Sequence, residues 1–209
     1  MRKQIMLFAA FGLILPLALA VPAYSGNQEA KDVQAHLDAA LRVYLEQPEN
    51  IPSVIEPLNK GLAAYPDSIR LLQFRANFHC NGGMLAECRA DNARVLELQP
   101  AQAEAFMMLC MLDEVEGAER QVYEACYLKA AELFAARSAP SRGWDGDLEI
   151  SYKFNYVFAL LLARHPDAEK EKAELLSRAA ASHPSILVYI SEMLNEFDRE
   201  RILREVFTP

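Results

Sequence analysis

Two prolines that each close a helix-like segment lie 34 residues apart, and this spacing constrains the fold more than any other feature. Pro66 follows "GLAAY" and Pro100 follows "ECRADNARVLELQ". A helix ends near a proline, because proline lacks the backbone N–H and its ring clashes with the preceding turn. Between the two prolines, apolar residues recur at three- and four-residue intervals on either side of "NGG" at 81–83, a sequence typical of a turn. The pattern predicts a repeated unit of helix, turn, helix and proline.

Composition agrees with an all-α protein. The chain has 209 residues, of which 52% are hydrophobic and only 8 are glycine, and it lacks the long alternations of β-branched residues that indicate strands. In the second segment Ser53 is a plausible N-cap, and "RSAPSRGWDGD" at 137–147 has the composition of a loop. Helical periodicity predicts helices within residues 31–47, 53–65, 69–80, 84–99, 101–117, 118–136, 148–164, 173–183 and 185–207.

The unit from Ile69 to Pro100 resembles a tetratricopeptide repeat, whose period is also 34 residues. Leu72, Ala76, His79, Cys88 and Pro100 take the positions that define the family's pattern. The unit departs from that pattern in two places: His79 replaces the usual aromatic residue, and Asn92 stands where a bulky ring is common. The resemblance implies a right-handed α-solenoid of about four helical hairpins, at 31–66, 69–100, 103–136 and 148–184, with residues 185–206 capping the open end.

The resemblance also implies where a partner would bind. In tetratricopeptide proteins, the first helix of each unit lines a concave groove that holds an extended peptide or a partner helix. An arginine beside asparagines could hold a carboxylate or a peptide backbone, and methionines adapt to apolar side chains. The alternative for Met107 and Met108 is packing between units. The groove residues implied for this chain are Arg70, Gln73, Asn77 and Asn81 in one unit, and Glu104, Met107, Met108 and Met111 in the next.

The four cysteines fall into two pairs with the same period. Cys80 and Cys88 are centred on residue 84, and Cys110 and Cys126 are centred on residue 118, one repeat later. Residues equidistant from the turn of a helical hairpin face each other, so we expect the disulfides Cys80–Cys88 and Cys110–Cys126. Two alternatives stay open at this point: free cysteines that pack as small apolar residues, and a zinc site that includes His79, although no CxxC pair is present.

The N-terminus predicts export. Residues 1–20 combine Arg2 and Lys3, a short apolar run and the small-residue cleavage motif Ala18-Leu19-Ala20, as in a bacterial secretory signal peptide. We expect cleavage after Ala20 or, as a second choice, Ala23, and the alternative is an uncleaved membrane anchor. Residues 21–30 read as a flexible leader, and residues 31–209 as the repeat domain. The expected location is the periplasm, with no membrane insertion after cleavage.

Charge and motifs narrow the class of function. Loss of Arg2 and Lys3 with the signal peptide changes the net charge from −8 to −10, which disfavours nucleic acid as a partner. The sequence contains no GxSxG or HExxH motif, so we expect no catalysis, cofactor or metal. The leading hypothesis is a periplasmic module that binds a protein or peptide. The alternatives are an immunity or chaperone-like protein for one exported partner, a structural subunit of an envelope assembly and, last, a hydrolase.

Overall fold

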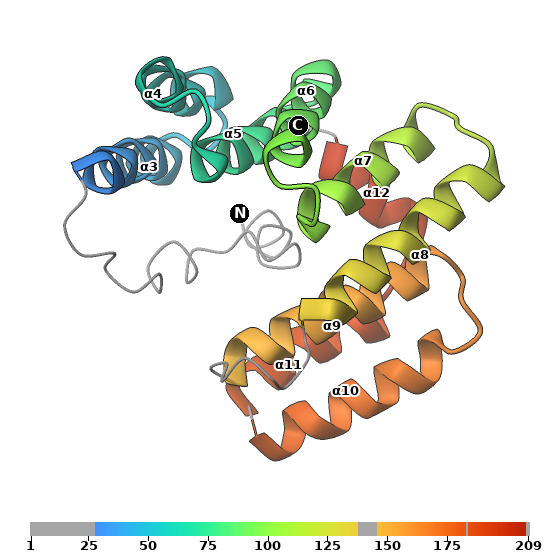
Figure 1. The fold of residues 1–209 in the computed structure, drawn as a ribbon. Helices are drawn as coiled ribbons and strands as arrows, with labels where there is room; N and C mark the ends of the chain where they lie inside the picture. The colour runs from blue at the N-terminus through green and yellow to red at the C-terminus, as the bar shows by residue number, and fades with distance from the viewer. Residues whose placement is uncertain (1–27, 138–145, 183, 208–209) are drawn as a thin grey trace. The chain divides into compact units, whose positions relative to one another are not determined.

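A computed structural model describes residues 28–137, 146–182 and 184–207 (Figure 1). This part of the chain consists of helices and contains no strand, so the predicted all-α class is confirmed. The predicted signal peptide at 1–20 and the leader up to residue 27 lie outside the described residues, as does most of the loop at 137–147. The last three residues of the predicted leader already belong to the first described helix, which begins at Gln28.

The helix boundaries mostly follow the apolar periodicity. Helix α4 begins at Ile51 rather than at Ser53, because Asn50 is the N-cap: its side-chain oxygen accepts a hydrogen bond from the Ser53 backbone N–H at 3.4 Å. The C-terminal segment forms two helices. The described helices are α3 (Gln28–Glu46), α4 (Ile51–Ala64), α5 (Ile69–Asn81), α6 (Leu85–Leu98), α7 (Ala103–Val115), α8 (Arg120–Arg137), α9 (Gly146–Leu162), α10 (Ala168–Ser182), α11 (Pro184–Asn195) and α12 (Arg199–Phe207).

The helices belong to two compact units. The described residues of the N-terminal unit are 28–105 and 204–207, and the C-terminal unit is Phe106–Leu203. In the N-terminal unit, α3 packs along α4, α4 along α5 and α5 along α6, and α3 also contacts α5. Helix α3 buries a narrow stripe of Val33, Leu37 and Ala40, whereas α5, which contacts three neighbouring helices, is buried on more sides. A single hairpin would leave part of such a surface exposed, so the hairpins are stabilised by stacking.

Two turns repeat the same chemistry 34 residues apart. Gly83 ends the first, with φ of 69°, and Gly117 ends the second, with φ of 89°. In both, the residue after the glycine donates its backbone N–H back five residues, from Met84 to His79 and from Ala118 to Asp113, at 2.9 Å. This is the Schellman helix ending, which needs a residue in the left-handed region and therefore favours glycine. The 34-residue period is thus present in the backbone as well as in the sequence.

In the C-terminal unit successive helices also pack on one another. Helix α8 packs along α9, and α9 packs against α10, which in turn contacts α11 (Figure 1). Helix α7 is joined to α8 by the Cys110–Cys126 disulfide and by the hydrogen bond from Tyr127 to Glu114, in agreement with the predicted hairpin at 103–136. Helix α9 buries side chains from Phe154 to Leu162 around most of its circumference. A helix that is apolar on nearly every side needs more than one neighbour to cover it.

Gly61 marks a close approach of three helices in the N-terminal unit. A Cβ atom added at this position in α4 would lie 2.9 Å from Cγ of His36 on α3 and 2.9 Å from Cδ1 of Leu71 on α5. Gly61 itself is buried. Glycine inside a helix costs about 1 kcal/mol of stability relative to alanine. Glycine is nevertheless found here because the space between α3, α4 and α5 does not admit a Cβ atom.

We expect the Gly61→Ala variant to be less stable than wild type by about 1–2 kcal/mol, because the overlap with His36 and Leu71 outweighs the gain in helix propensity. Urea unfolding followed by far-UV circular dichroism would measure the change. Combining Gly61→Ala with His36→Ala should recover part of the loss. A Gly61→Ala protein that is more stable than wild type would contradict this packing.

Candidate functional site

Helix α5 carries the polar residues that were predicted to face a partner. Arg70, Gln73 and Asn81 are each partly exposed on it. The Arg70 guanidinium donates through Nη2 to the side-chain oxygen of Gln34 on α3 at 2.7 Å. This contact places the polar side chains of two first helices, α3 and α5, next to each other. Glu104, at the start of α7, is also partly exposed.

The other predicted groove residues are not on the surface. Met107 and Met111 are 1% and 0% exposed, and Met108 is 5% exposed. Asn77 is also buried, with 7% of its surface exposed. The physical reason is the period of α5 and α7: these four positions fall on stripes that contribute to the cores of the units, and an apolar methionine gains more from burial than from solvent. The candidate surface therefore narrows to Arg70, Gln73, Asn81 and Glu104.

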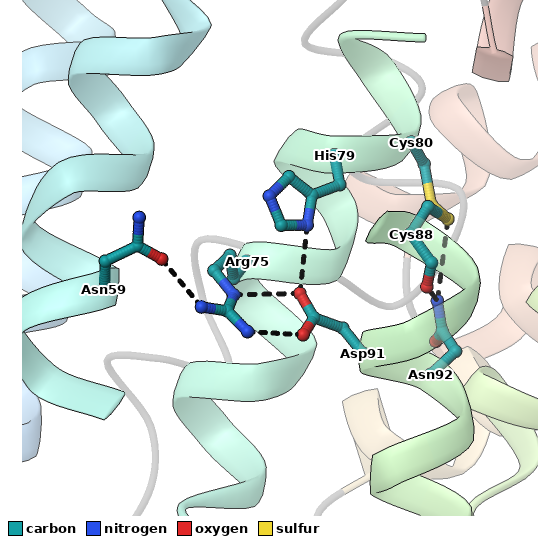
Figure 2. Close-up of polar contacts among 7 residues, drawn as sticks. All are labelled: Asn59, Arg75, His79, Cys80, Cys88, Asp91 and Asn92. Carbon is teal, nitrogen blue, oxygen red and sulfur yellow. Dashed lines mark hydrogen bonds and ion pairs between the residues drawn. A yellow bond between two sulfur atoms is a disulfide. The ribbon is translucent and has the colours of Figure 1, made fainter. Parts of the chain in front are cut away.

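A second group of polar residues was not predicted and joins α4, α5 and α6 (Figure 2). Asp91 on α6 accepts two hydrogen bonds from Arg75 on α5, from Nε at 2.9 Å and from Nη2 at 2.6 Å. Nδ1 of His79, one turn further along α5, lies 3.0 Å from Oδ2 of Asp91. Arg75 also donates through Nη1 to Oδ1 of Asn59 on α4 at 2.7 Å. We call Asn59, Arg75, His79 and Asp91 the Asp91 network.

The Asp91 network keeps a carboxylate charged in a buried position. The Asp91 side chain is only 6% exposed and that of His79 is 9% exposed. Burial by itself would raise the pKa of Asp91, but the hydrogen bonds from His79 and Arg75, together with the Arg75 charge, outweigh it and lower this pKa below its ordinary value of 3.8. A planar guanidinium that meets both oxygens of a carboxylate is the strongest geometry for such a pair.

Both residues that depart from the tetratricopeptide pattern make polar contacts between or within α5 and α6. His79 stands where an aromatic ring is usual, and its ring nitrogen contacts Asp91 instead of filling an apolar space. Asn92, beside Asp91, donates through Nδ2 to the Cys88 carbonyl oxygen at 2.9 Å and lies 3.7 Å from the Cys88 sulfur. A sequence signal for the network existed: Asp91 and Asn92 stand between the buried Cys88 and Val95 on one stripe, which places polar residues at positions that face the core.

Both predicted disulfides are present. Cys80 and Cys88 are joined across the α5–α6 turn with their Cα atoms 5.1 Å apart, and Cys110 and Cys126 join α7 to α8 with a Cα separation of 5.5 Å. No cysteine is free. Among the described residues no three His, Cys, Asp or Glu side chains are arranged to hold a metal ion, and the disulfide uses the cysteines that a zinc site with His79 would need.

The C-terminal unit has a polar cluster of its own. Arg199 at the start of α12 forms an ion pair with Glu114 of α7, with Nη1 and Oε1 2.5 Å apart. The Tyr127 hydroxyl of α8 donates to Oε2 of Glu114 at 2.8 Å, and the Arg199 guanidinium lies over the Tyr123 ring at 4.7 Å. Burial, then the Glu114 charge, raise the pKa of Tyr127, so this phenol stays protonated as a donor. The cluster attaches the last helix to α7 and α8.

These two clusters satisfy their own charges and are built like structural contacts. No helix in the described part of the chain has the length and apolar character needed to cross a membrane. Comparison with protein-family models, with curated proteins and with solved structures gives no match.

Proposed function

We propose that this chain is an exported, non-catalytic binding module with a tetratricopeptide-like arrangement, which holds a peptide or protein partner on the face formed by α3 and α5. The observation that carries the proposal is the 2.7 Å contact between Arg70 and Gln34. In a tetratricopeptide-like stack the first helices of successive units lie side by side and line the groove, and this contact joins two such helices through their polar side chains.

The chemistry of this face suits an extended chain. Arg70 uses Nη2 for Gln34, and its guanidinium has further N–H groups that point in a fixed fork. Gln73 and Asn81 follow at one and three turns along α5 and are partly exposed. Amide side chains can both donate to and accept from a peptide backbone, and an arginine can hold a carboxylate with two parallel hydrogen bonds.

The disulfides support export. Cys80–Cys88 and Cys110–Cys126 account for all four cysteines of the chain, and disulfides persist in oxidising compartments rather than in the cytosol of most organisms. Together with the signal-peptide pattern of residues 1–20, this supports the periplasm as the location of the proposed module. The acidic charge of the chain disfavours nucleic acid and anionic lipid as the partner.

A photo-crosslinking side chain placed at Gln73 should capture a defined partner in the periplasm, whereas the same side chain at Lys60 should not, because Lys60 lies on α4 and is 67% exposed. Arg70→Glu should reduce capture at position 73 by about tenfold, the effect of losing about 1.4 kcal/mol. Lys60→Glu is the matched charge reversal and should leave capture unchanged. Equal capture from positions 60 and 73, or a partner that tolerates Arg70→Glu, would refute this face as the binding site.

A further inference from the structure

Exposed apolar side chains gather on one stretch of the C-terminal unit. Five large hydrophobic side chains are exposed among the described residues, and three of them lie between positions 115 and 128: Val115 at 41%, Val122 at 54% and Leu128 at 37%. Val122 and Leu128 share the outer face of α8 with the exposed Ala125, at intervals of three residues. We call Val122, Ala125 and Leu128 the α8 stripe.

The α8 stripe is not needed for the core of the unit. Helix α8 buries its opposite face, which carries Tyr127, Ala130, Ala131 and Phe134. Helix α10 shows the usual alternative, since its exposed residues include the charged Glu169, Glu174 and Arg178. A contiguous apolar strip on an outer helical face is typical of a surface that another molecule covers.

The basic side chains near the α8 stripe are paired with acidic ones, and an unpaired acidic side chain remains. Arg120 donates to Glu124 at 2.8 Å and Lys129 to Glu132 at 2.7 Å, so both exposed bases of α8 are neutralised within the helix. Glu119 is exposed one turn before Val122 and makes no ion pair within the described residues. The whole chain carries 29 acidic against 21 basic residues, which strengthens the negative field at this surface.

We propose that the α8 stripe is a docking site for a basic amphipathic helix of a partner protein. The apolar residues of that helix contact Val122, Ala125 and Leu128, and a lysine or arginine one turn away meets Glu119. Recognition of an amphipathic helix through anchors at three- and four-residue intervals is a general mode of binding. The partner is basic because, among the described residues beside the stripe, the charged side chain without an ion pair is the Glu119 carboxylate, in a chain of net charge −8.

A second copy of this chain suits the stripe less well. Two copies would bring together surfaces of like charge, which costs free energy. The site shares no residue with the α3–α5 face, so the two proposals can fail separately.

The test is a fluorescence anisotropy titration of the mature chain with a labelled helical peptide of about 18 residues, long enough to form a helix, in which leucines and lysines occupy opposite faces. At about 150 mM salt, where long-range attraction is screened, we expect wild type to bind it. Val122→Ser with Leu128→Ser should weaken binding at least tenfold, and Glu119→Lys should weaken it severalfold. Leu45→Ser, at an apolar position of α3 that is 67% exposed, is the control and should have no effect.

Two comparison peptides separate this site from general attraction between charges. A peptide with glutamate in place of lysine should not bind, and a peptide with serine in place of leucine should bind far more weakly. The proposal is wrong if the stripe variant, shown to be folded by circular dichroism, binds like wild type, or if the peptide without leucine binds as tightly. It is also wrong if sedimentation shows a wild-type dimer that the stripe variant abolishes, because the occupant would then be a second copy.

Discussion

Replacing Asp91 by alanine is expected to lower the free energy of unfolding by about 3 kcal/mol, the largest effect of any single substitution considered for this chain. The change removes the acceptor of Arg75 and His79 at once and leaves their donors between three helices without a partner. Breaking a buried ion pair on one side typically costs about 3–5 kcal/mol, and the lower end applies because the Arg75 side chain is 23% exposed. Urea unfolding of wild type and variant would measure the difference.

A matched control is the exposed ion pair between Asp67, which precedes α5, and Arg94 of α6. Asp67 accepts a hydrogen bond from Arg94 at 2.6 Å, but these side chains are 63% and 43% exposed. Exposed pairs contribute less than about 1 kcal/mol, so Asp67→Ala should cost little although the distance is as short as that from Arg75 to Asp91. Similar losses for the two variants would show that burial does not strengthen the Asp91 network.

The same network makes stability depend on pH. The pKa of Asp91 is lower in the folded chain than its ordinary value of 3.8, so the unfolded chain takes up this proton first as the pH falls. The contribution of Asp91 is therefore complete above about pH 4 and is lost as the pH falls through the folded pKa. Asp91→Ala should unfold with a shallower pH dependence than wild type in this range. An identical pH profile for both proteins would exclude Asp91 as the titrating group.

The regular features of this fold were predictable because they repeat. The 34-residue spacing of Pro66 and Pro100 predicted helix–turn–helix units, and the structure repeats that spacing in the helix endings at Gly83 and Gly117. Both disulfides followed from the symmetry of the cysteines about these turns. Turn residues and cysteines act locally, so their effect on the backbone can be predicted from a few neighbouring positions.

The departures arise where several helices compete for one surface. Met107 and Met111 were assigned to a groove by analogy and are buried, because a methionine suits a core as well as a binding surface. The Asp91 network was missed because its polar residues lie on three helices, and the pairing of charges across helices depends on their register.

The Cys80–Cys88 and Cys110–Cys126 disulfides should differ in how fast they are reduced in the folded chain. Cys80 and Cys88 are 1% and 0% exposed, and Cys110 is 0% exposed, whereas Cys126 is partly exposed. A small thiolate must reach a sulfur atom to attack it, so we expect Cys110–Cys126 to open first. Alkylation after mild reduction, followed by peptide mapping with mass spectrometry, would give both rates. In denaturant, where access is equal, the difference should largely disappear.

Removing each disulfide should also cost stability, by roughly 2–3 kcal/mol in the chain-entropy model, since the closed loops span 8 and 16 residues of sequence separation. Cys80→Ala with Cys88→Ala, and Cys110→Ala with Cys126→Ala, test the pairs without leaving a free thiol. The sulfur atoms are largely buried, so each double variant also loses packing. The loss of the bond can be measured separately from the loss of packing. Wild type that is reduced in denaturant and then refolded under reducing conditions lacks the disulfides but keeps the cysteine side chains. A crosslink from Cys88 to Cys110 in the native protein would contradict the pairing on which the repeat rests.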